Sequence, residues 1–283
     1  MAELSDKKKF LKYGLLLVLI LGSAAGLLIA RKYFLVDKRI VGLEKLPAHP
    51  FSFSDIDHGS WDRLLQNFVD GEGRVDYAAW SQDGLARQDL KDYLRALSAV
   101  DPSFEASQTD RLACWINAYN ALTIYGILEE YPTTSIRNHT SLIGGYNIWN
   151  DLKLRVGERP FSLNQIEHEV LREMDEPRIH FAIVCASRSC PRLLSRAYRG
   201  DSLETQFAEN ARHFFAQTSN FQVEADGQTV YLSPILKWFA SDFGSSPKEV
   251  IDKIRPYLPQ ASTVHMAESP RIEYLPYDWR LNE

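Results

Sequence analysis

The stretch Arg178-Ile-His-Phe-Ala-Ile-Val-Cys-Ala-Ser-Arg-Ser-Cys-Pro191 joins an apolar segment to two thiols. The apolar run 179–184 predicts a buried strand that ends at Cys185. Proline is favoured at the first position of a helix, so Pro191 predicts that Cys190 caps one. Folds of the α/β type tend to place their sites at strand–loop–helix junctions. We therefore expect any chemistry of this chain to centre on this junction.

Composition narrows the classes of function. The chain has 283 residues, of which 45% are hydrophobic, which is enough for one sizeable domain or two small ones. Its net charge of -5 gives no electrostatic reason to expect nucleic-acid binding. No Walker loop, GxGxxG, GxSxG or HExxH pattern occurs, which lowers the odds of nucleotide-dependent enzymes, serine hydrolases and metalloproteases of those kinds. We predict no cofactor.

The N-terminal region has the pattern of a membrane anchor. Residues 13–30 carry no charge, and 18 residues in a helix reach about 27 Å, just enough to cross a bilayer core. A cleaved signal peptide is the alternative, because Ser23 and Ala25 are small, but the apolar run continues past them. We expect a single-pass inner-membrane protein whose body faces the periplasm or exterior, where Cys185 and Cys190 could form a disulfide.

The rest of the chain predicts an α+β fold. We divide it into a tail with anchor (1–35), a linker (36–57) and a globular domain (58–283). Helices dominate, and the strands show no βαβ alternation, so we expect one mostly helical domain with a small mixed sheet, preceded by a transmembrane helix. Helical patterns occupy residues 60–68, 86–98, 110–125, 163–174, 203–217, 235–242 and 247–258; strand patterns occupy 74–77, 152–156, 271–282 and a hairpin over 221–232.

The helix over 110–125 is apolar all round, so it should be buried. Its Asn117 and Asn120 then need polar partners in the core. One interpretation is a structural hydrogen-bond network. The other is an amide that lines the substrate site and donates to an oxyanion.

A second helix brings a carboxylate into the core. Ser162 and Gln165 form a capping box that predicts a helix over 163–174. Glu167 lies in the middle of its apolar arc, and His168 lies about 100° further round, at the margin. A buried carboxylate is costly unless it is paired, so Glu167 is either a structural lock or a group that orients a histidine, binds metal or transfers a proton.

Five segments, in order, resemble the bacterial family called domain of unknown function 547. They are Trp115-Ile-Asn-Ala-Tyr-Asn-Ala-Leu-Thr, Ser162-Leu-Asn-Gln-Ile-Glu-His, 178–191, Leu232-Ser-Pro-Ile-Leu-Lys-Trp-Phe and Tyr277-Asp-Trp-Arg-Leu-Asn282. The resemblance spans about residues 58–283. It includes His180 and Asp278, whereas Cys114 stands where relatives carry an aromatic residue. The family has no settled chemistry, and plant relatives join a similar domain to a coiled coil, which implies that some members are interaction modules.

Three interpretations compete for the cysteines. Cys185 and Cys190 form a disulfide or remain inert buried thiols; one of them is a nucleophile; or both bind zinc with His168 and His180, although the spacing matches no familiar zinc motif. For a nucleophile, Cys190 is favoured over Cys185 because a helix N-terminus stabilises a thiolate. His168 would then be the base, ahead of a mid-strand His180, with Glu167 or Asp278 orienting it.

We predict a membrane-anchored, extracytoplasmic thiol hydrolase or transferase that acts on amide bonds of an envelope protein or peptide. The arrangement is papain-like or transglutaminase-like by analogy only. The catalytic candidates are Cys190, Cys185, His168 and Glu167; Asn117, Asn120 and Asp278 are substrate-lining or oxyanion candidates; no metal ligand is predicted. The alternative is a non-catalytic envelope binding or scaffolding module with a structural cysteine pair.

Overall fold

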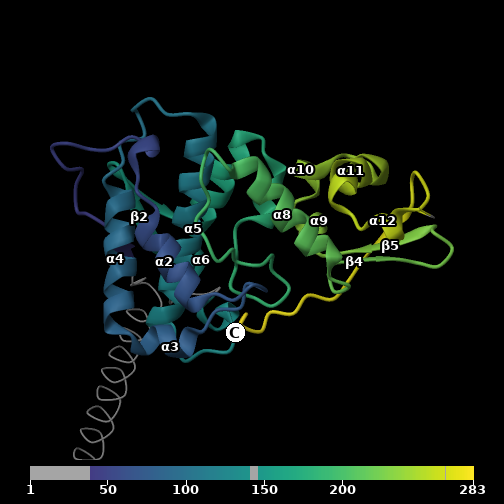
Figure 1. Ribbon diagram of the computed structural model, residues 1–283, viewed down its shortest axis with the longest axis horizontal. Coiled ribbons are helices and arrows are strands. Elements are labelled where there is room, and N and C mark those ends of the chain that lie inside the picture. The colour runs from purple at the N-terminus through teal and green to yellow at the C-terminus, as the bar shows by residue number, and fades with distance from the viewer. Residues whose placement is uncertain (1–38, 141–145, 265) are drawn as a thin grey trace, which may run out of the picture.

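A computed structural model describes residues 39–140, 146–264 and 266–283 (Figure 1). These residues form a mixed α+β fold with two separate three-stranded sheets, which confirms the predicted class and adds a second sheet. The predicted membrane segment at 13–30 lies outside the described residues. Within them, no helix combines the length and the apolar character that a bilayer crossing requires.

The first part of the fold is a group of helices around α5 (Gln108–Glu130). Helix α5 is buried on nearly all sides from Leu112 to Leu128, as its apolar pattern predicts, and Ser107 caps its start by accepting from the Asp110 backbone. Helices α3 (Tyr77–Gln82) and α4 (Gly84–Ser98) contact α5, and α2 (Gly59–Phe68) packs on α3 and α4. The sequence pattern was right for α2 and α4, whereas the predicted strand at 74–77 is a single bridge between Val69 and Val75 that leads into α3.

A small sheet packs on this helical group. Its order is β1 (Arg39–Val41), β2 (Leu152–Val156) and β3 (Arg159–Ser162), with β1 parallel and β3 antiparallel to β2. Strand β2 alternates buried and half-buried residues, as predicted, and its buried side faces α4 and α5. Short elements precede β2: a turn of 3₁₀ helix, η2 (Ile136–His139), and α6 (Ile148–Asp151).

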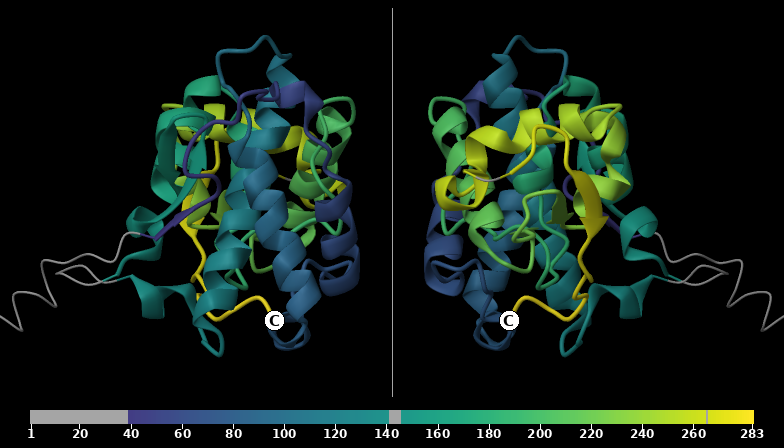
Figure 2. Two further views of the ribbon diagram at one scale, coloured as in Figure 1. Left: turned by 90° about the vertical axis from the view of Figure 1, so that its left-hand side faces the viewer. Right: turned by 90° about the vertical axis from the view of Figure 1, so that its right-hand side faces the viewer.

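The C-terminal part has its own sheet and core. The predicted hairpin is confirmed as β4 (Phe221–Val223) and β5 (Thr229–Leu232), and β6 (Arg271–Tyr274) adds in parallel. The helices of this part are α8 (Leu203–Ala216), α9 (Ile235–Trp238), α10 (Ala240–Phe243), α11 (Pro247–Ile254) and α12 (Gln260–Thr263). The side views in Figure 2 place the blue helices on one face and the yellow-green helices on the opposite face. The two parts have separate hydrophobic cores, centred on α5 and on α8 with α11.

The predicted strand over 179–184 is wrong. Residues Pro177–Phe181 form a 3₁₀ helix, η5, which starts with Pro177 and is capped by the Glu176 carboxylate. The chain then runs on without a strand partner, because the Asn120 side chain bonds the backbone of Ala182 and Val184. The run is apolar because it is buried between the two cores, and a short apolar run does not distinguish strand from helix.

The predicted helix after Cys190 is also absent. Residues 191–200 form no helix, and α8 begins only at Leu203. Upstream, the capping box of Ser162 and Gln165 is confirmed, but the helix it starts changes character. One α-turn, α7 (Leu163–Gln165), is followed by a π-helical segment, η3 (Ile166–Leu171), and a 3₁₀ turn, η4 (Arg172–Met174). π-Helical turns are rare in proteins, and those that occur are often found at functional sites.

A buried histidine makes stability depend on pH. His58 Nδ1 lies 2.7 Å from the Tyr93 hydroxyl, and burial, together with the Arg199 charge, lowers the pKa of His58 to about 4. Its stabilising contribution is therefore present above pH 6.5 and is lost as the pH falls towards 4. We expect His58→Gln to lower the free energy of unfolding at pH 7.5. At pH 5 this loss should be about 2 kcal/mol smaller, because the contribution of His58 is by then reduced. Urea unfolding of both proteins at the two pH values measures this difference; an equal loss at both would contradict it.

Candidate functional site

Cys185 and Cys190 lie together, as the junction predicted, but the turn between them is different. Both are free and partly exposed, and their sulfurs are 2.8 Å apart. Between them, buried Ala186 has a φ of 55°, which is uncommon for a residue with a side chain. The Ala186 carbonyl accepts from the Asn282 backbone, so the tail of the chain holds this turn.

Polar groups converge on the sulfur of Cys185. The Ser187 hydroxyl lies 3.0 Å away and the Tyr277 hydroxyl 3.2 Å away, and the two hydroxyl oxygens are 2.9 Å from each other. Burial alone would raise the pKa of Cys185. Hydrogen bonds from Cys190, Ser187 and Tyr277 outweigh burial and lower this pKa to about 7. The Cys185 thiol is therefore partly ionised at neutral pH.

The pKa of Cys190 moves in the opposite direction. Burial raises it well above the usual value, and the hydrogen bond to Cys185 raises it further. The reason for expecting a thiolate at Cys190 was a helix N-terminus, and the structure has no helix there. The geometry therefore favours Cys185 as the reactive thiol and Cys190 as the donor that stabilises it.

Both cysteines open on a cavity of about 230 Å³ between the two parts of the fold. Two other residues predicted for the site, Glu167 and His168, line the same cavity. Much of the wall is aromatic, and two of these rings, Trp238 and Trp279, stack with centroids 5.6 Å apart. The aromatic lining residues are Tyr119, Trp149, Trp238, Phe239, Tyr277 and Trp279.

Glu167 is buried, with 8% of its surface exposed. Its partner is the Tyr119 hydroxyl, which donates to Oε2 at 3.2 Å from the neighbouring helix α5. Burial raises the pKa of Glu167 to about 7, the Tyr119 hydrogen bond opposes this rise, and the negative charge of Cys185 adds to it. Glu167 therefore titrates over the same pH range as Cys185.

His168 lies at the exposed edge of the cavity. Its Nδ1 is 3.1 Å from the Arg172 guanidinium, and no hydrogen bond to either sulfur is formed among the described side chains. Burial lowers the pKa of His168, and the Arg172 charge lowers it further. The ring is therefore mostly neutral at pH 7, but its position beside Arg172 differs from that of a base bonded to the thiol.

His180 belongs to a charged cluster that the sequence did not predict. Its Nε2 is 2.7 Å from Asp242, its ring stacks on Phe239 at 3.9 Å, and only 2% of the residue is exposed. Arg172 donates twice to Asp242 and holds the pKa of that carboxyl well below its usual range. Burial lowers the pKa of His180 to about 4, although Asp242 opposes this. Nδ1 of His180 is buried and has no partner in the described residues.

The remaining predicted residues lie elsewhere. Asn117 binds the backbone of Tyr198 through both amide atoms, as Asn120 binds Ala182 and Val184. These bonds favour the structural interpretation of both amides. Arg280 binds the Asp278 carboxylate and lowers the pKa of Asp278 to about 2. Asp278 lines neither the aromatic cavity nor the polar cavity described below.

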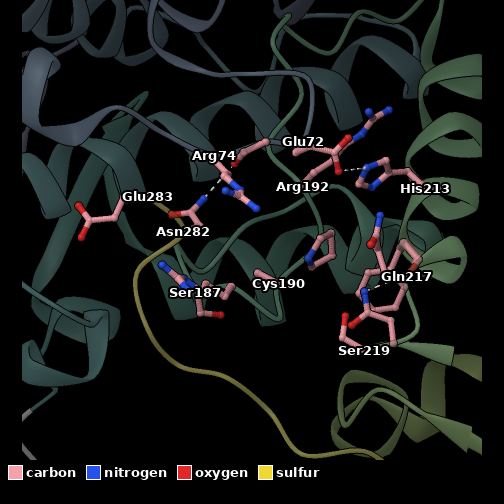
Figure 3. Close-up of a pocket in the computed structure, with 15 residues that line it drawn as sticks. Glu72, Arg74, Ser187, Cys190, Arg192, His213, Gln217, Ser219, Asn282 and Glu283 are labelled. Carbon is pink, nitrogen blue, oxygen red and sulfur yellow. Dashed lines mark hydrogen bonds and ion pairs between the residues drawn. The ribbon is translucent and has the colours of Figure 1, made fainter.

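A second, polar cavity of about 190 Å³ also borders the cysteine loop (Figure 3). Cys190 and Pro191 line both cavities, whereas Cys185 lines only the aromatic one. Polar and charged side chains surround the polar cavity, and His213 Nε2 lies 3.2 Å from the Glu72 carboxylate. In the part of the chain that the structure describes, no three His, Cys, Asp or Glu side chains are arranged to hold a metal ion.

Fold and site together define an α+β protein with a paired-thiol site that opens on an aromatic cavity. Residues 104–215 match the family described as protein of unknown function, DUF547, which confirms the resemblance found in the motifs. No curated protein and no solved structure matches the chain. The matched segment contains both cysteines and Glu167, but Asp242 and Tyr277 lie beyond it. Tyr277 stood in a quoted motif, whereas Asp242, 62 residues from His180, had no sequence signal.

The ionisation of Cys185 predicts selective alkylation. We expect iodoacetamide to modify Cys185 with a midpoint near pH 7, because the thiolate is the nucleophile. Tyr277→Phe removes one donor and should move the midpoint towards higher pH. Peptide mass spectrometry after timed labelling measures both. Cys114 is the internal control, since burial raises its pKa to about 12; modification of Cys190 ahead of Cys185 would contradict the assignment.

Proposed function

We propose that this protein is a thiol-dependent hydrolase or acyltransferase that acts on amide bonds, with Cys185 as the nucleophile. The observation that carries the proposal is the Cys185 sulfur, whose pKa is lowered to about 7 and which opens on a cavity also lined by Glu167. A nucleophile, a proton carrier and a cavity for the reacting group are the minimum parts of acyl transfer. Cys114, fully enclosed in the core, offers none of these.

In the first step, the Cys185 thiolate attacks the amide carbonyl carbon, and negative charge moves from sulfur to the carbonyl oxygen. Two donors to the thiolate, the Tyr277 hydroxyl and the Ser187 backbone N–H, lie beside the sulfur. They are the nearest candidates to donate hydrogen bonds to the carbonyl oxygen as it becomes negative. We assign them this role ahead of Asn117 and Asn120, whose amides are already bonded to backbone.

Collapse of the tetrahedral intermediate needs a proton for the leaving amine. Glu167 is suited to give it, because a carboxyl whose pKa is near 7 is about half protonated at neutral pH. Water or an acceptor amine then attacks the thioester carbon, and Glu167 takes back a proton. The C–S bond breaks, the Cys185 thiolate leaves, and the carboxylic acid or the new amide is released. A second candidate for proton transfer is His180, because Asp242 fixes its Nε2 and leaves the Nδ1 lone pair without a partner.

The substrate class in this proposal is a peptide amide of the cell envelope. The aromatic wall of the cavity supports an apolar or ring-bearing group beside the scissile bond. The uncharged run at 13–30 supports a membrane anchor with the domain on the periplasmic or outer side. The alternative, a non-catalytic binding module, is favoured by the structural use of Asn117 and Asn120, and it predicts no covalent intermediate.

An acyl-enzyme assay tests the proposal. We expect p-nitrophenyl acetate to release p-nitrophenolate in a burst and to leave an acetyl group on Cys185, detected by peptide mass spectrometry. Cys185→Ala should abolish the burst, whereas the matched variant Cys114→Ser should retain it. If the acetyl group is absent, or is found equally on Cys114, the nucleophile assignment is wrong and the binding module is favoured.

The role of Glu167 predicts a dependence on the leaving group. We expect Glu167→Gln to leave acylation by p-nitrophenyl acetate nearly unchanged, because p-nitrophenolate leaves without a proton. Hydrolysis of peptide anilides should fall by about 10²–10⁴-fold, the range for loss of a general acid. Equal losses with both substrates would indicate that Glu167 is structural.

The anchor is tested separately from the chemistry. We expect the full chain to sediment with membranes and the chain lacking residues 1–35 to stay in the supernatant and still fold, because the uncharged run at 13–30 is then removed. Circular dichroism and membrane fractionation measure this. Membrane sedimentation of the truncated chain would contradict it.

A further inference from the structure

We infer that Cys185 and Cys190 are a redox-active dithiol that reduces disulfide bonds, a second activity of the same loop. The inference shares with the proposed function only the reactivity of Cys185. It requires in addition that Cys190 resolves a mixed disulfide, a step that acyl transfer does not need.

The geometry places the resolving sulfur in position. The two sulfurs are 2.8 Å apart, and a disulfide needs about 2.05 Å, so less than about 1 Å of approach closes the bond. The Cys185 backbone N–H also donates to Cys190 Sγ at 2.9 Å, which fixes the second sulfur against the first. Both cysteines line the aromatic cavity, so a substrate disulfide that reaches Cys185 lies beside Cys190 as well.

The two thiols have complementary protonation. A thiol whose pKa is near ambient pH is the best attacking group, and Cys185 fits this while Cys190 remains protonated. Once Cys185 is bound in a mixed disulfide it carries no charge. The negative charge that helped to raise the pKa of Cys190 is then gone, so Cys190 ionises more easily. The backbone N–H of Cys185 stabilises the resulting thiolate.

The reaction balances in two exchanges. The Cys185 thiolate attacks one sulfur of the substrate disulfide, forms a mixed disulfide and expels the other sulfur as a thiolate. Cys190 then loses its proton to that thiolate or to water and attacks the Cys185 sulfur. The second substrate thiolate leaves, and two electrons have passed from the dithiol to the substrate. A small dithiol, such as dithiothreitol in the assay, returns the electrons by the reverse exchanges.

The cavity indicates the class of disulfide. Six of its fifteen lining residues are aromatic, and it holds about 230 Å³, enough for the sulfur and its nearest apolar substituent. Its walls therefore favour a disulfide with apolar or aromatic flanks, in a peptide or a small molecule, over a strongly charged one. Bis(4-nitrophenyl) disulfide, an uncharged aromatic disulfide whose thiolate product is coloured, is a suitable probe.

The test counts thiolates and adducts on the folded full-length chain in detergent, in a Cys114→Ser background. We expect two coloured thiolates per chain and a product with no adduct, two hydrogens lighter than the reduced protein. Cys190→Ser should release one and keep one adduct on Cys185. Cys185→Ser should react far more slowly, since Cys190 is protonated.

Two stable adducts on the parent chain, or a single release with a stable adduct, would overturn the dithiol. The Cys190→Ala variant repeats the measurement if Cys190→Ser does not fold. Acetylation by p-nitrophenyl acetate, run on separate, fully reduced aliquots of the same proteins, separates the two ideas. Exchange that fails while Cys185 is still acetylated removes only this inference, and exchange without acetylation removes only the acyl-transfer function.

Discussion

The structure depends on two amide side chains of the buried helix α5. Asn117 and Asn120 lie one helical turn apart. Each donates to a backbone carbonyl and accepts from a backbone N–H of a segment that has no strand or helix partner. An unpaired backbone group in a core costs free energy comparable to a lost hydrogen bond. These two amides therefore let an irregular chain pass through the interior. The cysteine turn follows directly from the segment that Asn120 holds, so the site is irregular and still fixed.

Charge within the cavity follows a second constraint. Cys185 and Glu167 both titrate near neutral pH, and the negative charge of one raises the pKa of the other. The two groups therefore favour a state in which a single proton is held between them, and their titrations belong to the pair. Arg172 stands nearby but is committed to Asp242 by two hydrogen bonds. The Arg172 guanidinium therefore secures α10 through Asp242, while its charge also opposes the rise in the pKa of Glu167.

The sequence predicted elements whose signals are local. The capping box of Ser162, the hairpin, the all-round apolar α5 and the burial of Glu167 each follow from spacing within a few residues. The strand at 179–184 and the helix after Cys190 were wrong because their backbone is satisfied by distant side chains, which no local pattern reports. The roles of Asp242 and of the Tyr277 hydroxyl were likewise missed, because each contacts its partner, His180 or Cys185, across a long stretch of sequence. The prediction from the sequence that Cys185, Cys190, Glu167 and His168 share one site agrees with the cavity they line. The prediction that Cys190 is the more acidic thiol does not agree with the structure.

The C-terminal segment, yellow in Figure 1, runs from the second sheet back to the first helices and has a consequence for biosynthesis. It supplies Tyr277 to the sulfur of Cys185, 92 residues earlier, and Asn282 to the backbone of Ala186 and Val75. A growing chain therefore carries both thiols long before it carries the hydroxyl that stabilises the thiolate. Until the last segment docks, Cys185 lacks the Tyr277 hydrogen bond that helps to lower its pKa, so the thiolate has all its donors only when the domain is closed.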